Sequence, residues 1–387
     1  MVNKLTLAAV GDIMLTRQVG EKIKEHGPFY PFCYIADALK KFDIVFANLE
    51  TPVTSRGQPS SKQCPHITFR SDPSSVSGLK QAGVNIVSLA NNHMVDYGDI
   101  GVLDTIDILS RHDIYCVGAG INEQEARRPA IIEKKGYKIA FLAYSSAFQA
   151  GTYIASRHKA GGAQLILKDI QKDIRDIIQK VDFVIVSLHW GIEYDDYPVP
   201  VEMDIARRII DAGAALVLGH GPHYIQGIEE YNNGKIVYSL GNFVFDEPFQ
   251  KSNESYIFGC TLGNSRIISS EILPVIINGE YQPLFAPIKV KQEIQNRIES
   301  LTESYRKFPQ DKRELNNYQY LADIYRKLSQ GCPFSIIKNF HLSLITPKIL
   351  LKSMIRLRGR HISLFLKVIV RLMYRKMRNL RKRIINK

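Results

Sequence analysis

Residues 5–12 have the sequence LTLAAVGD, a short apolar run that ends abruptly in a glycine and a carboxylate. Five further runs end in the same way: residues 44–50 (IVFANLE), 84–93 (VNIVSLANNH), 183–191 (FVIVSLHWG), 216–223 (LVLGHGPH) and 235–243 (KIVYSLGNF). Runs of this length that are rich in Val and Ile are typical of buried β-strands. In open α/β sheets the ligand site lies beyond the carboxyl ends of the strands. The pattern therefore predicts one site, built at a sheet edge.

The segments between these runs have helical spacing of their apolar residues. Residues 100–111, 169–180 and 202–212 are predicted to be helices, and strands that alternate with such helices predict an α/β fold with a central sheet. After residue 243 the pattern changes to short apolar runs broken by Gly, Asn and Ser. Residues 256–262, 266–277 and 283–290 are predicted to be antiparallel strands that close the same domain.

The composition is that of an ordinary globular protein, with 45% hydrophobic and 23% charged residues in 387. The five cysteines are odd in number and have no paired spacing, so neither a disulfide framework nor a cysteine-based zinc site is expected. Residues 1–10 lack the pattern of a signal peptide, and no uncharged apolar run reaches the roughly 20 residues of a membrane span. We therefore expect a cytoplasmic protein.

The net charge of +13 comes from the C-terminal end of the chain. Residues 348–387 contain fourteen Lys or Arg and no Asp or Glu, so the rest of the chain is close to neutral. Residues 362–373 place apolar side chains on one helical face, with basic residues on the other. This tail is expected to lie on an anionic membrane surface or to dock on a partner protein. Nucleic acid is a weaker alternative, because no recognition motif accompanies the charge.

Polar side chains at the predicted strand ends carry the donor atoms of a metal site. These side chains are Asp12, Glu50, Asn92, His189, His220 and His223. Carboxylate and amide oxygens together with imidazole nitrogens suit Mn, Fe, Zn or Mg. Two such divalent ions can generate a hydroxide at neutral pH and stabilise an in-line displacement at phosphorus. Arg17 is a candidate contact for a phosphate or carboxylate, and a solvent-exposed surface role is the alternative.

Six motifs in this order resemble the CapA family, the bacterial capsule synthesis or poly-γ-glutamate biosynthesis group of calcineurin-like metallophosphoesterases. They are GDIML (11–15), NLE (48–50), ANNH (90–93), HWG (189–191), GHGPH (219–223) and YSLGNF (238–243). The resemblance covers about residues 5–290. It implies a four-layer α/β/β/α sandwich with two divalent metal ions at the strand ends.

The resemblance also implies roles for individual residues. Asp12 would bind the first metal and Glu50 would bridge the two. Asn92 and His189 would bind the second metal together with His220, while His223 would return to the first. His93 would protonate the leaving oxygen or hold the phosphate, which makes His93, Asp12 and Arg17 the predicted catalytic group. Whether Asn91 or Asn92 is the ligand stays open, although the neighbour of His93 fits the family pattern better.

Three departures from the superfamily pattern concern the first metal. Met14 stands where an Asp-x-His motif would have its histidine, Glu50 replaces an aspartate, and two residues instead of one separate His220 from His223. These departures predict that the first metal is weakly held or absent.

The expected function is metal-dependent phosphoester hydrolysis or transfer, in the synthesis or release of a capsular or poly-γ-glutamate-like polymer. The alternative is a non-catalytic component that binds an anionic polymer within a membrane-associated synthesis complex, with capsule-synthesis proteins as partners. Three parts are predicted along the chain: the metallophosphoesterase-like domain at 1–291, a helical extension at 292–346 and the basic helical tail at 347–387.

Overall fold

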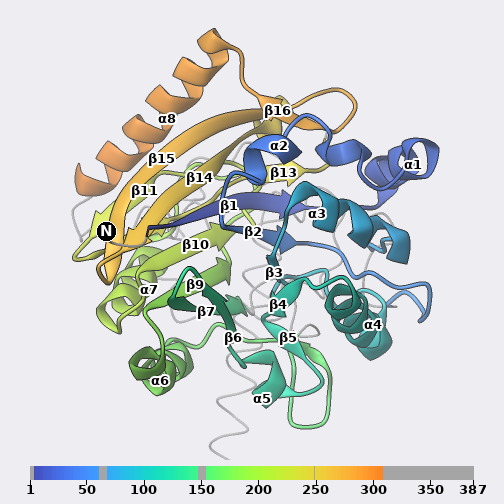
Figure 1. The fold of residues 1–387 in the computed structure, drawn as a ribbon, viewed down its shortest axis with the longest axis horizontal. Coiled ribbons are helices and arrows are strands. Elements are labelled where there is room, and N and C mark those ends of the chain that lie inside the picture. The colour runs from blue at the N-terminus through green and yellow to red at the C-terminus, as the bar shows by residue number, and fades with distance from the viewer. Residues whose placement is uncertain (1–3, 61–67, 147–153, 248, 308–387) are drawn as a thin grey trace, which may run out of the picture. The chain divides into compact units, whose positions relative to one another are not determined.

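A computed structural model describes residues 4–60, 68–146, 154–247 and 249–307 (Figure 1). These residues belong to one compact unit, Met1–Lys307. Residues 308–346 of the predicted helical extension and the whole basic tail lie outside the described residues. Within the described residues, no helix is both long and apolar enough to cross a membrane.

The first of two large sheets has the strand order β16-β15-β14-β1-β2-β3-β4. Its parallel strands are β1 (Leu5–Ile13), β2 (Ile44–Leu49), β3 (Ile86–Ser88) and β4 (Tyr115–Val117). Its antiparallel strands are β14 (Glu254–Gly263), β15 (Arg266–Ile277) and β16 (Pro283–Phe285). The short strand β13 (Asn242–Val244) pairs in parallel with the end of β1.

The second sheet has the order β11-β12-β10-β9-β7-β6. Its parallel core consists of β7 (Tyr137–Ser145), β9 (Phe183–His189), β10 (Leu216–His220) and β12 (Gly234–Val237). The edges β6 (Ala130–Lys134) and β11 (Ile228–Tyr231) are antiparallel. A small separate ladder joins β5 (Ala119–Gly120) to β8 (Gly161–Gly162).

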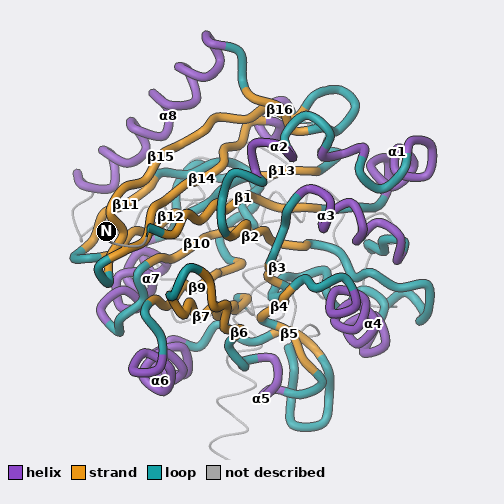
Figure 2. The backbone as a smooth tube through the Cα atoms, viewed as in Figure 1, coloured by secondary structure: helices purple, strands orange, loops and turns teal. Residues whose placement is uncertain are grey.

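Helices cover the outer face of each sheet (Figure 2). The first sheet packs against α1 (Arg17–His26), α2 (Ala36–Leu39), α3 (Val76–Ala82) and α4 (Gly98–Arg111). The second packs against α6 (Leu167–Ile177) and α7 (Pro200–Asp211), with the short α5 (Glu123–Ala126) beside them. Four short 3₁₀ turns complete the described elements: Tyr30–Phe32, Pro73–Ser75, Ile178–Lys180 and Gln250–Asn253. The predicted α/β/β/α sandwich is confirmed.

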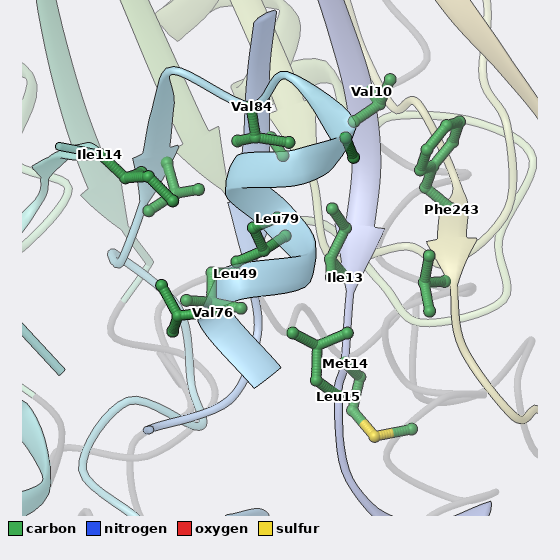
Figure 3. Close-up of a cluster of buried hydrophobic side chains, with 14 of the residues drawn as sticks. Val10, Ile13, Met14, Leu15, Leu49, Val76, Leu79, Val84, Ile114 and Phe243 are labelled. Carbon is green, nitrogen blue, oxygen red and sulfur yellow. The ribbon is translucent and has the colours of Figure 1, made fainter. Parts of the chain in front are cut away.

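Strand alternation explains the layers, because successive side chains of a strand point to opposite faces. On β2, Val45, Ala47 and Leu49 join the cluster beneath α1–α4, whereas Ile44 and Phe46 join the cluster between the sheets. Figure 3 shows the outer cluster, with Val76 and Leu79 of α3 beside Leu49 and Ile13. The same alternation carries the next inward-facing positions of β2, β9 and β10 to the site.

The prediction of a strand over 283–290 is wrong after Phe285. Helix α8 (Ile288–Lys307) begins there, directly after Pro287, whose carbonyl accepts a hydrogen bond from the Lys291 N–H. Proline is favoured at helix starts because its missing N–H would be unpaired there in any case. The buried side chains of α8 follow helical spacing: Ile294, Ile298, Leu301 and Tyr305. The predicted boundary at residue 291 falls inside this helix, which contacts β11 and β15.

Candidate metal centre

Asp12 reaches the space between the sheets because β1 is irregular near its end. Leu5, Leu7 and Ala9 face the second sheet, so strict alternation would turn Asp12 away from it. The register between β1 and β2 shifts between Ala9 and Asp12, which places Asp12 opposite Asn48. Gly11 permits this path, since a Cβ there would lie 1.9 Å from the Gly241 carbonyl oxygen.

Glu50 follows β2 and continues its inward face, since Ile44, Phe46 and Asn48 alternate before it. The carboxylate is fully buried. The side-chain amide of Asn48 donates to Asp12 Oδ1 at 2.8 Å and to Glu50 Oε2 at 3.4 Å. Two carboxylates from neighbouring strands are therefore linked by one amide, a role for Asn48 that the sequence analysis missed.

The second sheet supplies histidines to the same place. His189 ends β9 and His220 ends β10, and the two are directly paired in the sheet register. Both continue inward-facing positions of their strands and are buried. His220 Nδ1 donates to Asp12 Oδ1 at 3.2 Å, and His189 Nε2 lies 3.3 Å from Glu50 Oε1. The site thus joins the carboxyl ends of strands from both sheets.

His223 completes the group from the loop after β10, where its backbone has a φ of 60°. A non-glycine residue held in this left-handed region costs conformational energy, and such strain is frequent at functional sites. The Nδ1–H of His223 donates to Asn242 Oδ1 at 2.8 Å. The other ring nitrogen, Nε2, lies 4.0 Å from Glu50 Oε1. One ligand atom each from Asp12, Glu50 and His223 lies within 4.8 Å of the others.

Several buried polar atoms of the predicted ligands have no hydrogen-bond partner within the part of the chain that the structure describes. They are Glu50 Oε1, Asn92 Oδ1, His220 Nε2 and both ring nitrogens of His189. Buried polar atoms are nearly always paired, because leaving one unpaired costs about 1–3 kcal/mol. A buried set of oxygen and nitrogen atoms without hydrogen-bond partners suits a divalent cation such as Mn, Fe or Zn.

The charges of the cluster are strongly coupled. Burial opposes the ionised form of Asp12, but the hydrogen bond from His220 and the nearby histidines lower its pKa to about 2. Burial also opposes the charged form of His223, yet the charges of Glu50 and Asp12 raise its pKa to about 9. At neutral pH the metal-free site therefore holds a proton on His223 that offsets its carboxylates.

The structure distinguishes Asn91 from Asn92. The Asn91 amide donates to Asn48 Oδ1 and to the Leu49 carbonyl, and its Oδ1 accepts from the His93 N–H. All of these contacts are internal, so Asn91 is occupied in shaping the turn. Asn92 Oδ1 is the atom left without a described partner. The geometry favours Asn92 as the amide able to hold a metal.

His93 is fixed beside the cluster by Asp96 and Phe69. Its Nδ1 donates to Asp96 Oδ2 at 2.9 Å, because a carboxylate can only accept. The Phe69 ring stacks on the imidazole with centroids 3.9 Å apart, and the Phe69 N–H donates to the same Asp96 oxygen at 2.7 Å. Burial lowers the pKa of His93, but the charge and hydrogen bond of Asp96 outweigh it and raise that pKa overall.

Arg17 lies near this group and is held by Asp246. Its Nε donates to Asp246 Oδ2 at 3.1 Å, and Nη2 pairs with Oδ1 of the same carboxylate. The guanidinium carbon lies 5.4 Å from the centroid of Phe69, the ring that stacks on His93. The Arg17 side chain is 31% exposed while Asp246 is buried. Arg17 is thus fixed at one end and open to solvent in part.

Of the other residues singled out in the sequence, Met14 and Trp190 lie in the core and Tyr194 lies beside the cluster. Met14 lies in the hydrophobic cluster beneath the helices (Figure 3), and its sulfur accepts a hydrogen bond from the Thr16 N–H at 3.4 Å. It therefore offers nothing to the carboxylates. Trp190 is a core residue whose indole donates to the Tyr238 carbonyl. Tyr194, with its ring centroid 5.7 Å from that of His223, lies beside the cluster.

The raised pKa of His223 predicts that metal uptake is linked to proton release. Below about pH 9 the metal-free fold keeps a proton on His223, and a metal ion must displace it. In the unfolded chain the pKa of His223 is about 6.5. Protonation of His223 therefore contributes fully to the stability of the metal-free fold below that pH, and this contribution is lost as the pH rises through 9. We expect the affinity for Mn²⁺ to rise from pH 6.5 to 9. At pH 7.5 binding of Mn²⁺ should release the proton of His223 into the buffer. Isothermal titration calorimetry in two buffers of different ionisation enthalpy measures the release, and a pH-independent affinity would contradict the linkage.

Comparison with known sequences places this geometry in a family. The family described as "Bacterial capsule synthesis protein PGA_cap" matches residues 6–247. The chain belongs to this family. A Bacillus anthracis protein named "Capsule biosynthesis protein CapA" is 35% identical over 279 residues, which are 71% of this chain and 68% of that protein. "PGA biosynthesis protein CapA" of Bacillus subtilis (strain 168) is 33% identical over 287 residues, 74% of each chain. The resemblance stated from the motifs is confirmed.

A comparison of structures finds the NAD nucleotidase NadN of Haemophilus influenzae among the similar folds. The TM-score is 0.43 with 12% sequence identity, over 78% of this chain and 63% of that one.

Proposed function

We propose that this PGA_cap family protein is a divalent-metal-dependent hydrolase or transferase that acts on phosphoester-type bonds. Its place would be in the synthesis or release of a capsular or poly-γ-glutamate-like surface polymer. The observation that carries the proposal is the buried cluster in which carboxylate and imidazole groups converge and several of their atoms have no described hydrogen-bond partner. Structural ion pairs rarely leave such atoms unpaired, whereas a metal site requires them.

Two sets of ligands are available in this cluster. Asp12, Glu50 and His223 converge on one position. Glu50 also lies against His189, and the unpaired atoms of Asn92 and His220 extend the donor set. Glu50 would bridge the two positions. When bound there, divalent ions would activate water and stabilise the negative charge that develops on phosphorus oxygens.

His93 would act as the general acid. Because Nδ1 donates to Asp96, the proton available for transfer is on Nε2, and the raised pKa of His93 favours the form that carries it. The departing oxygen would take this proton as its bond to phosphorus breaks. Phe69 covers one face of the imidazole and would limit its rotation.

Arg17 would bind an anionic group of the substrate. Asp246 fixes the guanidinium through two hydrogen bonds, and the partly exposed remainder offers further N–H donors. A phosphate or a polymer carboxylate would suit this fork equally. The family names of the two Bacillus relatives point to such an anionic polymer.

Hydrolysis of generic phosphoesters tests the proposed activity. The full chain, stripped of metal and then supplied with Mn²⁺, Zn²⁺ or Mg²⁺, is expected to release product only in the presence of a divalent ion. The same assay with a chelator provides the control. Absence of turnover with every metal would contradict a phosphoesterase.

A non-catalytic role is the second candidate, favoured by Met14. The position of the expected first-motif histidine is buried in the hydrophobic cluster, so the first metal lacks one ligand. A protein that binds polymer without metal would hold an anionic chain at the same group of residues. Metal content separates the two candidates.

A further inference from the structure

We infer that Asn48 is a positioning residue that sets which oxygen of Asp12 and which oxygen of Glu50 is available to a cation, and that it thereby disfavours Ca²⁺. The inference rests on the proposed function, since it assumes that these carboxylates hold a metal. Asn48 precedes Glu50 by two residues on β2 and lies opposite Asp12 in the register of β1 and β2.

The two N–H bonds of the Asn48 amide account for one oxygen of each carboxylate. Asp12 Oδ1 accepts from Asn48 at 2.8 Å and also from His220 Nδ1 at 3.2 Å. Glu50 Oε2 accepts from Asn48 at 3.4 Å. Glu50 Oε1 has no hydrogen-bond partner among the described residues and lies 3.3 Å from His189 Nε2. Asp12 Oδ2 accepts one long hydrogen bond, from the Gly221 N–H at 3.5 Å, and lies 3.5 Å from His223 Nδ1.

Asn48 is itself held in one orientation. Its Oδ1 accepts a hydrogen bond from Asn91 Nδ2 at 3.2 Å, and Asn91 is anchored on the Leu49 carbonyl at 2.8 Å. Asn48 is fully buried, as are both carboxylates. The Asn48 amide nitrogen therefore faces Asp12 and Glu50.

This arrangement has a consequence for the choice of cation. An oxygen that already accepts a hydrogen bond binds a cation less readily. The bonds to Asp12 Oδ1 and Glu50 Oε2 therefore favour binding of a cation through the other oxygen of each carboxylate. Ca²⁺ takes 6–8 oxygen ligands and often uses both oxygens of a carboxylate. Zn²⁺ and similar ions accept fewer ligands and include imidazole nitrogen among them. Asn48 would thus favour the transition metals over Ca²⁺.

The test compares Mn²⁺ and Ca²⁺ binding by isothermal titration calorimetry in the full chain and in Asn48→Ala. Loss of a residue that orients metal ligands typically lowers metal affinity about 10–100-fold. We expect a loss of this size for Mn²⁺ and a smaller loss for Ca²⁺, because Glu50 Oε2 becomes available to chelate. The ratio of the two affinities should shrink, and a purely structural role would not change that ratio.

Asn85→Ala is the matched control. Asn85 precedes β3, and its Oδ1 accepts a hydrogen bond from the Val45 N–H at 2.7 Å, at the opposite end of β2 from the site. This variant should lose some thermal stability and keep both affinities. If Asn48→Ala does not fold, Asn48→Ser removes the contact with Glu50 through a shorter side chain, and the same change in ratio is expected.

Unchanged affinities in the Asn48 variants, or equal losses for both ions, would overturn the inference and leave the proposed function intact. Failure of the unaltered chain to bind Mn²⁺ would instead overturn the proposed function and the inference with it.

Discussion

Glu50→Gln is expected to lose its metal and its activity together. Glu50 Oε1 lies 3.3 Å from His189 Nε2 and 4.0 Å from His223 Nε2, so it can reach a metal held by either histidine. An amide of the same shape removes the charge and one ligand oxygen. We expect metal affinity to fall by more than the about 100-fold typical of lost outer-sphere partners, with turnover at background. Elemental analysis and the phosphoester assay measure the two effects.

Glu229→Gln provides the control for a half-buried carboxylate outside the cluster. Glu229 pairs with Arg207 and accepts a hydrogen bond from the Tyr238 hydroxyl at 2.6 Å. This variant should unfold at a lower temperature and keep its metal, because breaking a largely buried pair destabilises a fold without touching the site. A Glu50→Gln variant that keeps metal at the affinity of the unaltered chain would contradict the bridging role.

His93→Ala is expected to lower kcat while metal affinity stays unchanged. Positioned general acids contribute about 10²–10⁴-fold to rate, and His93 touches Asp96 and Phe69, not the atoms assigned to the metal. Metal titration and steady-state kinetics on the same preparation separate the two quantities. Loss of metal together with rate would place His93 among the ligands.

His112→Ala is the matched control for His93. His112 caps the C-terminal end of α4, and its ring donates to the Ile108 carbonyl at 2.9 Å. Its variant should keep full activity. An active His93→Ala enzyme would contradict the general-acid role.

Much of the fold could be predicted because alternation and strand-end chemistry are local signals. β15 was predicted with its observed bounds. The structure brings five of the predicted strand-end donors within ion-pair distance of one another: Asp12, Glu50, His189, His220 and His223. β7, a strand within the parallel core of the second sheet, was not singled out, because its apolar run ends in serine rather than in a ligand. α8 was placed too late because Pro283 and Phe285 continue the strand pattern up to its start.

The contacts that organise the site could not be predicted from spacing. The register shift between Ala9 and Asp12 reverses the face of one key side chain, and nothing in the sequence measures it except the Gly11 that permits it. The choice between Asn91 and Asn92, and the link through Asn48, depend on hydrogen bonds between strands that are far apart along the chain. Such long-range contacts are visible only in the folded protein.

Metal content of the full chain tests the central claim most directly. The protein is stripped with a chelator, incubated with Mn²⁺, freed of unbound ion and analysed by inductively coupled plasma mass spectrometry, beside Glu50→Gln treated in the same way. The two ligand sets predict about two equivalents of metal in the unaltered chain and a marked loss in the variant. No metal above background in either protein would contradict a metal-dependent function and favour a polymer-binding role.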